Sequence, residues 1–244
     1  MNYYKLPDMS YYQYGWNKEI TVIEKYINFE EIRQQTRGII LRSSQGNWQD
    51  KAYKVSCQNA KAAGLLVGNY HYYDNRYHPK RQAEAWAASI SDEQCVLGAW
   101  LDLEDSRPEQ YKTYLDWADC MAYFRLLKPN VKVGIYTRAS YFNDPAFSIP
   151  VNHVFRFMPL WVAHYNPHVT KPDLPKGWTD WELWQVTDDY LSDGWGAVSK
   201  EIDMNYFNGS EADFTARYGL GETPTQSNTV LMKYGKNVVE YRSK

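Results

Sequence analysis

Two acidic residues, one position apart, are the first side chains in this sequence that could carry chemistry. Asp102 and Glu104 fall within the segment LDLED at residues 101–105, at the end of the apolar run GAWLDLE. On a β-strand, residues two positions apart point to the same face, with Cα atoms roughly 7 Å apart. Two carboxyl groups on one face of a buried strand are costly unless they are solvated, paired or used. This separation is on the scale of the carboxyl pairs that cleave glycosidic bonds.

Such cleavage needs one protonated and one ionised group. The protonated acid donates to the leaving oxygen, and negative charge stabilises an oxocarbenium-like state. Neighbouring carboxyl groups meet both needs, because repulsion and partial desolvation raise the pKa of one while the other stays ionised. A single acid here would be read as the end of a strand, but two on one face favour a function. The spacing leaves open which of Asp102 and Glu104 keeps the proton.

The elements that must position these acids follow from the alternation of short apolar runs with longer polar, helix-like stretches. This pattern predicts parallel strands covered by helices. Eight strands are predicted, at Tyr4–Ser10, Gly38–Ser43, Leu65–Tyr73, Val96–Glu104, Val131–Thr137, Pro159–Tyr165, Trp181–Val186 and Glu201–Asn205. Helices are predicted at Asp50–Ala63, which Gly64 would cap, and at Pro79–Ser89 and Pro108–Leu127, each with proline in its first turn.

After Val131 the connections become short or irregular, so the C-terminal half would lack some covering helices. The predicted fold class is therefore α/β, a single incomplete (β/α)8-type barrel resembling a TIM barrel. Functional side chains on such a barrel gather at the C-terminal ends of the strands. Asp8, Asp102, Glu104 and Asp203 are all expected there. Pro7, directly before Asp8, is expected to interrupt the pairing of the first strand.

The chain length of 244 residues, with 44% hydrophobic residues, suits one substantial core. Residues 1–218 are predicted to form the catalytic barrel, and residues 219–244 a linker and a short C-terminal appendage. The appendage has a polar, turn-rich first half. Two apolar stretches around Gly235 then predict a hairpin.

Composition excludes several classes of partner. Lys and Arg number 27 against 29 Asp and Glu, a formal charge of −2, which disfavours nucleic acid and anionic membrane surfaces. No run reaches the length of a membrane span, and the N-terminus lacks the pattern of a signal peptide. Cys57, Cys95 and Cys120 are expected to be buried thiols. Because His71 and His164 lack a third ligand, no metal is expected, and no cofactor.

An ordered set of motifs resembles glycoside hydrolase family 25, the muramidases that include phage endolysins and bacterial autolysins. The resemblance covers about residues 3–217 and leaves only the tail outside. The motifs run in order through PDMSYYQ, INFEEIRQQTRGIILRSSQG, GLLVGNYHYYD, WLDLED, VGIYTRASYF, LWVAHYN, WELWQVTDD and EIDMNYFNGS. No single motif is decisive, whereas the ordered set is specific.

The resemblance implies a role for each acid. Glu104 would be the general acid that protonates the oxygen between N-acetylmuramic acid and N-acetylglucosamine. Asp102 would orient and stabilise the N-acetyl group of the substrate as it attacks the anomeric carbon, which gives retention through an oxazolinium-type intermediate. Asp8 and Asp203 would complete an acidic floor. A mechanism in which a carboxylate activates water remains open.

The resemblance also implies contacts to sugar. The chain holds 22 Tyr and 10 Trp, side chains that suit stacking on sugar rings and also core packing. Barrel packing explains any one aromatic residue about as well as sugar contact does. The positions that match the groove of the family are Tyr70, Tyr72, Tyr136, Tyr165 and Trp184, with Arg42 and Gln185 as polar contacts.

The function implied is therefore that of an N-acetylmuramidase, or lysozyme, whose partner is bacterial peptidoglycan. A non-catalytic glycan-binding barrel is the alternative from a different class, although a binder has no need of a desolvated acid pair. A chitinase-like enzyme ranks below both, because LDLED lacks the spacing DxxDxDxE. Without a signal peptide, the expected setting is a phage-encoded enzyme held in the host cytoplasm before release to the wall, or a virion component. The oligomeric state is left open.

Overall fold

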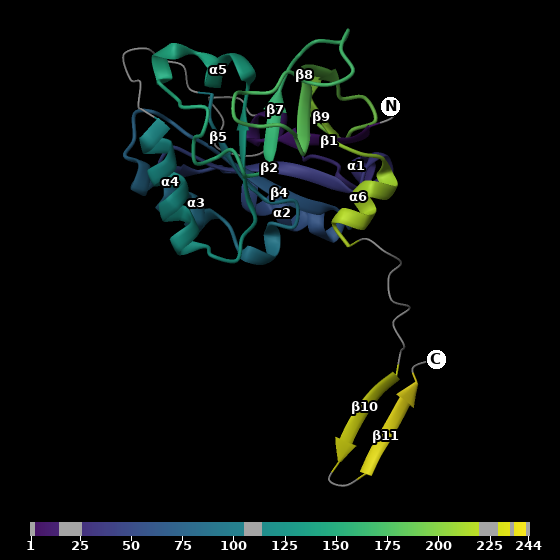
Figure 1. Cartoon of the computed structure of the whole chain (residues 1–244). Coiled ribbons are helices and arrows are strands. Elements are labelled where there is room, and N and C mark those ends of the chain that lie inside the picture. The colour runs from purple at the N-terminus through teal and green to yellow at the C-terminus, as the bar shows by residue number, and fades with distance from the viewer. Residues whose placement is uncertain (1–2, 15–25, 105–113, 220–228, 235–236, 243–244) are drawn as a thin grey trace.

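The computed structural model describes residues 3–14, 26–104, 114–219, 229–234 and 237–242. Within them, eight strands close into a barrel, shown in Figure 1. The barrel strands are β1 (Tyr4–Met9), β2 (Gly38–Gln45), β4 (Leu66–Tyr72), β5 (Ala99–Asp102), β6 (Val133–Thr137), β7 (Leu160–Ala163), β8 (Leu183–Leu191) and β9 (Glu201–Phe207). The predicted α/β barrel is confirmed, and each predicted strand overlaps one of these.

The pairing of β1 closes the barrel, since β1 is parallel to β2 and antiparallel to β9. Its register with β9 runs without a break from Tyr4 to Asp8, so the interruption expected at Pro7 is not found on that side. The ladder with β2 begins only at Asp8. A short strand β3 (Trp48–Gln49) folds back on β2 outside the closed ring.

Strand β9 corrects the expectation that every barrel strand is parallel. It runs antiparallel to both of its neighbours, β8 and β1. Asp203 is the third residue of β9 and therefore lies near its beginning, not at its C-terminal end. Because the strand is reversed, its beginning lies at the barrel end where the parallel strands finish. Asp203 pairs there directly with Asp8.

Helices cover the outside of the first half of the barrel. They are α1 (Phe29–Gln35), α2 (Tyr53–Ala62), α3 (Pro79–Ser89), α4 (Tyr114–Leu127) and the short α5 (Ala139–Asn143), and α6 (Glu211–Arg217) follows β9. Helix α3 begins at Pro79 as predicted, and Gly64 follows the C-cap of α2 with a positive φ of 81°. The proposed start of α4 at Pro108 lies outside the described residues. Short 3₁₀ turns occur at Tyr11–Tyr14, Asp92–Gln94 and Pro145–Phe147.

The second half of the barrel has fewer helices, as expected. Residues 164–182, between β7 and β8, and residues 192–200, between β8 and β9, are all described and contain no helix. Helices α3 and α4 lie side by side on one flank (Figure 1). No helix in the described part of the chain is long and apolar enough to span a membrane. Cys57, Cys95 and Cys120 are free, buried thiols, as expected.

Two apolar clusters follow from the alternation of side chains along the strands. One fills the space between the barrel and its helices, and the other fills the barrel interior. Trp100 and Trp161 form the centre of the interior cluster, with ring centroids 5.9 Å apart in an edge-to-face arrangement. Gly134 on β6 leaves room for the Trp100 ring, because a Cβ atom there would overlap it. These indoles form the floor on which the polar end of the barrel rests.

The tail contains the hairpin expected around Gly235. Strands β10 (Thr229–Tyr234) and β11 (Asn237–Arg242) pair antiparallel, with Thr229 opposite Arg242. Within the described residues these two strands pair only with each other. The division into a barrel domain of residues 1–218 and an appendage of residues 219–244 stays a prediction.

We expect Gly134→Ala to destabilise the barrel by about 1–3 kcal/mol, the usual cost of overpacking a well-packed interior. The added methyl group would overlap the Trp100 ring and lie 2.9 Å from the carbonyl oxygen of Pro159. Gly38→Ala is the matched comparison, because the three atoms nearest to its added methyl group belong to side chains, those of Leu97, Phe214 and Leu6. Thermal unfolding should show the larger loss for Gly134→Ala, and equal losses would contradict this account.

Candidate active site

A cavity of about 250 Å³ opens at the barrel end where the parallel strands finish. It brings together all four acids selected from the sequence, which come from β1, β5, the residues just after β5, and β9. The lining residues are Asp8, Tyr70, Asp102, Glu104, Tyr136, Trp161, Tyr165, Gln185, Asp188 and Asp203. The expectation that Asp102 and Glu104 share a face agrees with their place in one cavity wall.

A second cavity, of about 330 Å³, adjoins the first. The two share Glu104, Tyr136 and Tyr165, and the second adds Arg138 and His164 among other residues. Glu104 therefore lies on the wall between them, whereas Asp102 lines only the first. A chain-like ligand that spans both cavities would pass Glu104 at their junction.

Gln185 connects the tyrosines of the cavity to Asp8. Its Oε1 accepts hydrogen bonds from the hydroxyl groups of Tyr136, at 2.7 Å, and of Tyr165. Its Nε2 donates to Oδ2 of Asp8 at 2.9 Å. Asn205 donates to the same oxygen at 2.9 Å, and its own Oδ1 accepts from the Trp161 indole at 2.7 Å. Two amide groups thus fix the Asp8 carboxylate.

Asp8 and Asp203 share a proton. Burial raises the pKa of Asp8 to about 6, although the hydrogen bonds from Asn205 and Gln185 oppose this rise. Burial, and next the charge of Asp8, raise the pKa of Asp203 to about 9. The hydrogen bond between the two acids lowers the pKa of Asp8 and raises that of Asp203, so Asp203 is the acid of the pair that keeps its proton to higher pH.

Asp102 is the most deeply placed acid of the reactive pair. Its side chain is buried, and Oδ1 has no hydrogen-bond partner among the described residues. Burial raises its pKa well above the usual range, and the charges of Glu104 and Asp8 add to that rise. The positive charge of Arg42 opposes it. A buried carboxyl oxygen without a partner is costly unless a ligand completes it.

The structure places the predicted sugar contacts unequally. Tyr70, Tyr136, Tyr165 and Gln185 line the cavity. Tyr72 is half-buried and lies in register with Asp102, but it is not part of the wall of either cavity.

Arg42 is buried, and it does not line the cavity. Its Nε donates to Asp50 at 2.8 Å, and its guanidinium lies 4.9 Å from the ring of Tyr11. It therefore acts on Asp102 through its charge, beneath the surface. The direct polar contact to substrate that the resemblance implies for Arg42 stays a prediction.

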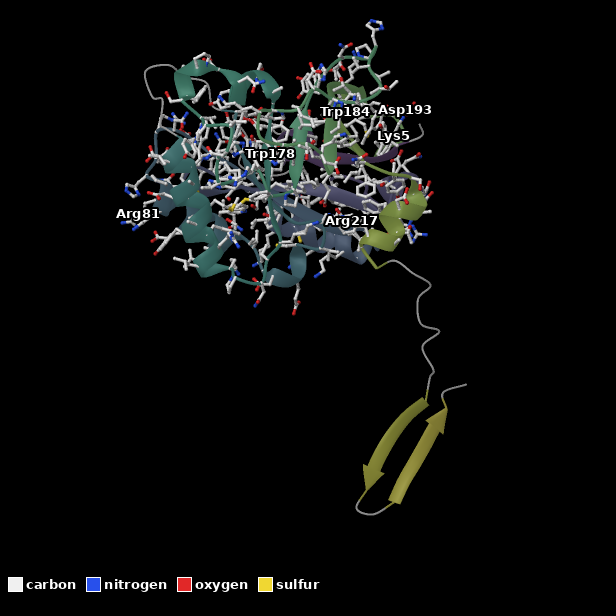
Figure 2. All side chains as sticks on the ribbon, in the orientation of Figure 1. Lys5, Arg81, Trp178, Trp184, Asp193 and Arg217 are labelled. Carbon is white, nitrogen blue, oxygen red and sulfur yellow. The ribbon has the colours of Figure 1, made fainter. Side chains whose placement is uncertain are left out.

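Trp184 also lies away from the cavity, in the core outside the barrel. Its indole N–H donates to the carbonyl oxygen of His164, and its ring packs edge-on against Tyr206 and Trp181. The physical reason is alternation along β8, since Gln185 points into the barrel and its neighbour therefore points out. Figure 2 shows Trp184 with the other side chains. The expected sugar contact is replaced by a packing role.

Two residues of the cavity wall, Trp161 and Asp188, were not selected from the sequence, and neither was Asn205, which donates to Asp8. Asn205 lies two positions after Asp203, so strand alternation could have found it. Asp188 is exposed and adds a fifth acid to the cavity wall. Among the described residues, no group of three His, Cys, Asp or Glu side chains could hold a metal ion.

Comparison with known proteins identifies relatives of this chain. The family model described as "Glycosyl hydrolases family 25" matches residues 14–195. Lysozyme M1 of Streptomyces globisporus is 30% identical over 191 residues, which cover 72% of this chain and 61% of that protein. The chain thus spans about three fifths of the length of this relative.

Solved structures share the fold. A bacterial lysozyme from Streptomyces coelicolor aligns with a TM-score of 0.66 at 22% identity, over 90% of this chain and 98% of that one. A family GH25 lysozyme from Aspergillus fumigatus aligns with a TM-score of 0.67 at 20% identity, over 89% and 99%. At these identities the likeness concerns the barrel alone.

We expect Asp203→Asn to flatten the loss of stability with rising pH. The pKa of Asp203 is about 9 in the folded chain against 3.8 for an ordinary aspartate. Between these values the folded state holds a proton that the unfolded state has lost. Stability therefore falls as pH rises, by at most about 1.4 kcal/mol per pH unit from this group. Thermal unfolding from pH 5 to 9 measures the slope.

Asp193→Asn removes an exposed carboxyl group outside the wall of this cavity and serves as the control. Asp193 is labelled in Figure 2. That variant should keep the slope of the unaltered chain. An unchanged slope in Asp203→Asn would mean that the proton shared with Asp8 is not held as described.

Proposed function

Because the chain belongs to glycosyl hydrolases family 25, we propose that it is an N-acetylmuramidase, which hydrolyses the β-1,4 bond between N-acetylmuramic acid and N-acetylglucosamine in bacterial peptidoglycan. The observation that carries the proposal is the position of Glu104 on the wall between two adjoining cavities. A glycan chain that lay in both cavities would present a glycosidic oxygen at this junction. The match to the family model confirms, at the level of the family, the resemblance inferred from the ordered motifs.

We propose that Glu104 is the general acid. It lies two residues beyond the end of β5, is half-buried, and belongs to both cavities. A donor of the proton to the leaving oxygen must reach the bond between two sugar residues, and this position meets that requirement. Proton donation by a placed acid contributes roughly 10²–10⁴-fold to the rate.

Asp102 serves the sugar on the inner side of the bond. In this proposal its carboxyl group accepts the N–H of the substrate acetamido group while the acetamido oxygen attacks the anomeric carbon. The C–O bond to the leaving sugar breaks as Glu104 gives up its proton, and an oxazolinium forms. Water then opens this intermediate, with Glu104 as base, and the β-configuration is restored. The Oδ1 of Asp102, which has no partner among the described residues, supports this role.

Asp8 and Asp203 supply the floor beneath that sugar. Gln185 and Asn205 fix Asp8, so its charge cannot turn away from the cavity. A fixed negative group in a partly desolvated cavity stabilises developing positive charge more than a mobile, hydrated one does. The proposal assigns electrostatic stabilisation to Asp8, while the proton held by Asp203 limits the repulsion within the pair.

Glu104→Gln should lower the rate on purified peptidoglycan by at least about 100-fold, because an amide cannot donate the proton to the leaving oxygen. New reducing ends measure the rate, and borohydride reduction followed by mass analysis identifies the terminal sugar. A muramidase gives reduced muramic acid. Asp193→Asn is the matched carboxyl-to-amide control and should keep full activity.

The same measurements separate the alternatives. Reduced glucosamine at the new ends would replace muramidase by glucosaminidase activity. Intact glycan with retained binding would instead identify a non-catalytic glycan-binding barrel. Full activity of Glu104→Gln, with unchanged thermal unfolding, would overturn the assignment of the acid.

The anomer released first tests substrate assistance. Because two inversions at the anomeric carbon restore its configuration, proton NMR of early products should show the β-anomer before mutarotation. A substrate with trifluoroacetyl in place of acetyl on the muramic acid nitrogen should react more slowly, since its oxygen is a weaker nucleophile. Initial release of the α-anomer would indicate a directly activated water.

A further inference from the structure

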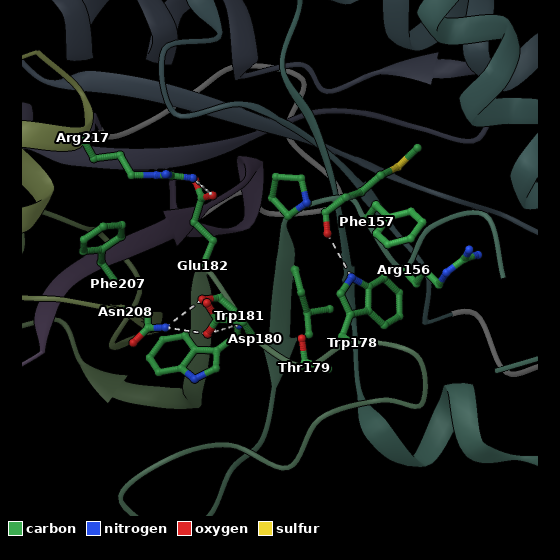
Figure 3. Close-up of a pocket in the computed structure, with 13 residues that line it drawn as sticks. Arg156, Phe157, Trp178, Thr179, Asp180, Trp181, Glu182, Phe207, Asn208 and Arg217 are labelled. Atoms are coloured by element: carbon green, nitrogen blue, oxygen red, sulfur yellow. Dashed lines mark hydrogen bonds and ion pairs between the residues drawn. The ribbon is translucent and has the colours of Figure 1, made fainter. Parts of the chain in front are cut away.

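A cavity separate from the proposed catalytic acids opens at the other end of the barrel. Its volume is about 350 Å³, and residues at the starts of β7 and β8, the end of β9 and the end of α6 line it. Figure 3 shows Trp178, Trp181, Glu182, Asn208 and Arg217 in its wall. We call it the lower cavity. Its volume falls within the range of small-molecule sites.

Hydrogen bonds fix the walls of the lower cavity. The Trp178 indole donates to the carbonyl oxygen of Met158 at 2.9 Å. Asn208 Nδ2 donates to Asp180 Oδ1 at 3.0 Å and to the carbonyl oxygen of Trp181 at 2.9 Å. Both sets of bonds are drawn in Figure 3. The loops before β7 and β8 are therefore held in place, and a ligand would meet a preformed site.

Charges in the lower cavity balance one another. Glu182 is buried and accepts from Lys132 Nζ at 2.8 Å, from Arg217 at 2.5 Å and from the Tyr218 hydroxyl at 2.6 Å. These donors hold the pKa of Glu182 below its usual value despite burial. Of the remaining charged groups in the wall, Arg156 is positive and Asp180 negative. The lower cavity thus suits a ligand without net charge better than a phosphate.

Aromatic and amide groups in the wall narrow the ligand further. Phe157 is 83% exposed, and the Arg156 guanidinium lies 4.2 Å from its ring centroid. Asn208, Asp180 and Thr179 are also exposed and offer amide, carboxylate and hydroxyl groups. An apolar ring face beside planar polar groups matches a sugar, which has apolar C–H faces and a rim of hydroxyl groups.

We propose that the lower cavity binds an uncharged sugar residue of the wall glycan, as a second site without catalysis. The proposal rests on the proposed function, since it takes its ligand from the same polymer. Glu182 directly precedes β8 and lines the lower cavity, and Gln185 on β8 lines the catalytic cavity. Three residues along an extended chain separate the two positions by about 10 Å. Trp100 and Trp161 fill the barrel between the two ends. One glycan strand therefore cannot pass through the barrel, and the lower cavity would hold another strand.

A second site on an insoluble polymer raises the retention of the enzyme without changing chemistry. Once one site is bound, the other site meets glycan at a high effective concentration. The overall affinity can then exceed that of either single site by up to about 10⁴-fold. The lower cavity should therefore matter on intact wall and not on short soluble fragments. This difference separates a binding role from a structural one.

Two variants test the proposal in a Glu104→Gln background, which prevents digestion. Phe157→Ala removes the exposed ring, and Thr179→Trp fills the opening of the lower cavity. Leu126→Ala is the matched control, because Leu126 is 76% exposed on α4 and lies outside the cavity walls. We expect each test variant to bind purified, protein-free peptidoglycan at least about 5-fold more weakly in sedimentation, and the control to bind normally.

Hydrogen exchange locates the contact. A peptide-free tetrasaccharide of alternating N-acetylglucosamine and N-acetylmuramic acid, and chitotetraose, should each protect residues 156–160 and 178–182 in Glu104→Gln. Thr179→Trp should abolish that protection. Equal sedimentation of all variants, or protection confined to the catalytic cavity, would overturn the proposal.

Turnover of soluble glycan, measured on the chain with Glu104 intact, tests the muramidase function separately from the second site. Phe157→Ala and Thr179→Trp should match the unaltered chain in that assay. Absence of turnover in the unaltered chain would reject the muramidase function, whereas normal turnover with unchanged wall binding in the variants would reject only the second site. Unaltered thermal unfolding confirms that each variant is folded.

Discussion

Three carboxyl groups gathered at one end of a closed barrel, two of them buried and the third half-buried, set the conditions that the rest of the site must meet. Asp8, Asp102 and Asp203 each have a raised pKa, and burial is the largest cause in every case. Without compensation, such charges would open the end of the barrel to water. For Asp8 the compensation comes from the amide groups of Gln185 and Asn205. The hydroxyl groups of Tyr136 and Tyr165 and the Trp161 indole hold these amides in turn.

The reversal of β9 explains why the acids are so close. On antiparallel strands, residues directly opposite have Cβ atoms only about 4.5–5.5 Å apart, and like charges there repel. Asp8 and Asp203 occupy such a pair. The repulsion is relieved because one proton is shared between them. A parallel ninth strand with the same sequence would put Asp203 near the opposite end of the barrel, where it could not join this group.

Much of this arrangement follows from sequence pattern, and the remainder depends on register. Apolar runs and helix-like stretches predict the eight strands, and the spacing of Asp102 and Glu104 predicts their common face. Strand direction cannot be read from β9 alone, because a short buried strand looks the same in either direction. Trp184 and Gln185 are neighbours on β8 and were both selected, although on a strand only one of them can point into the barrel. Register with β7 and β9 shows that it is Gln185.

The long-range hydrogen bonds of the site could not be predicted from the sequence for a different reason. Gln185 contacts Asp8 across 177 positions of the chain, and Asn205 contacts Asp8 across 197. Neither pairing has a local pattern, because an amide is compatible with exposed, turn and buried positions alike. Arg42 shows the reverse case. The family motif implied a polar contact to sugar, whereas the structure shows that Nε donates to Asp50 and that the positive charge lowers the pKa of Asp102.

The unequal roles proposed for Asp102 and Glu104 follow from how far each lies along one segment. Asp102 is the last residue of β5, is buried, and lines only the inner cavity. Glu104 stands two residues further on, is half-buried, and faces both cavities. Positive charge that develops on one sugar is stabilised best from the more buried position, that of Asp102, because electrostatic interactions are less screened there. A proton for the oxygen between two sugars must come from the position that reaches both. The two residues from the end of β5 to Glu104 are therefore enough to separate the acid from its partner.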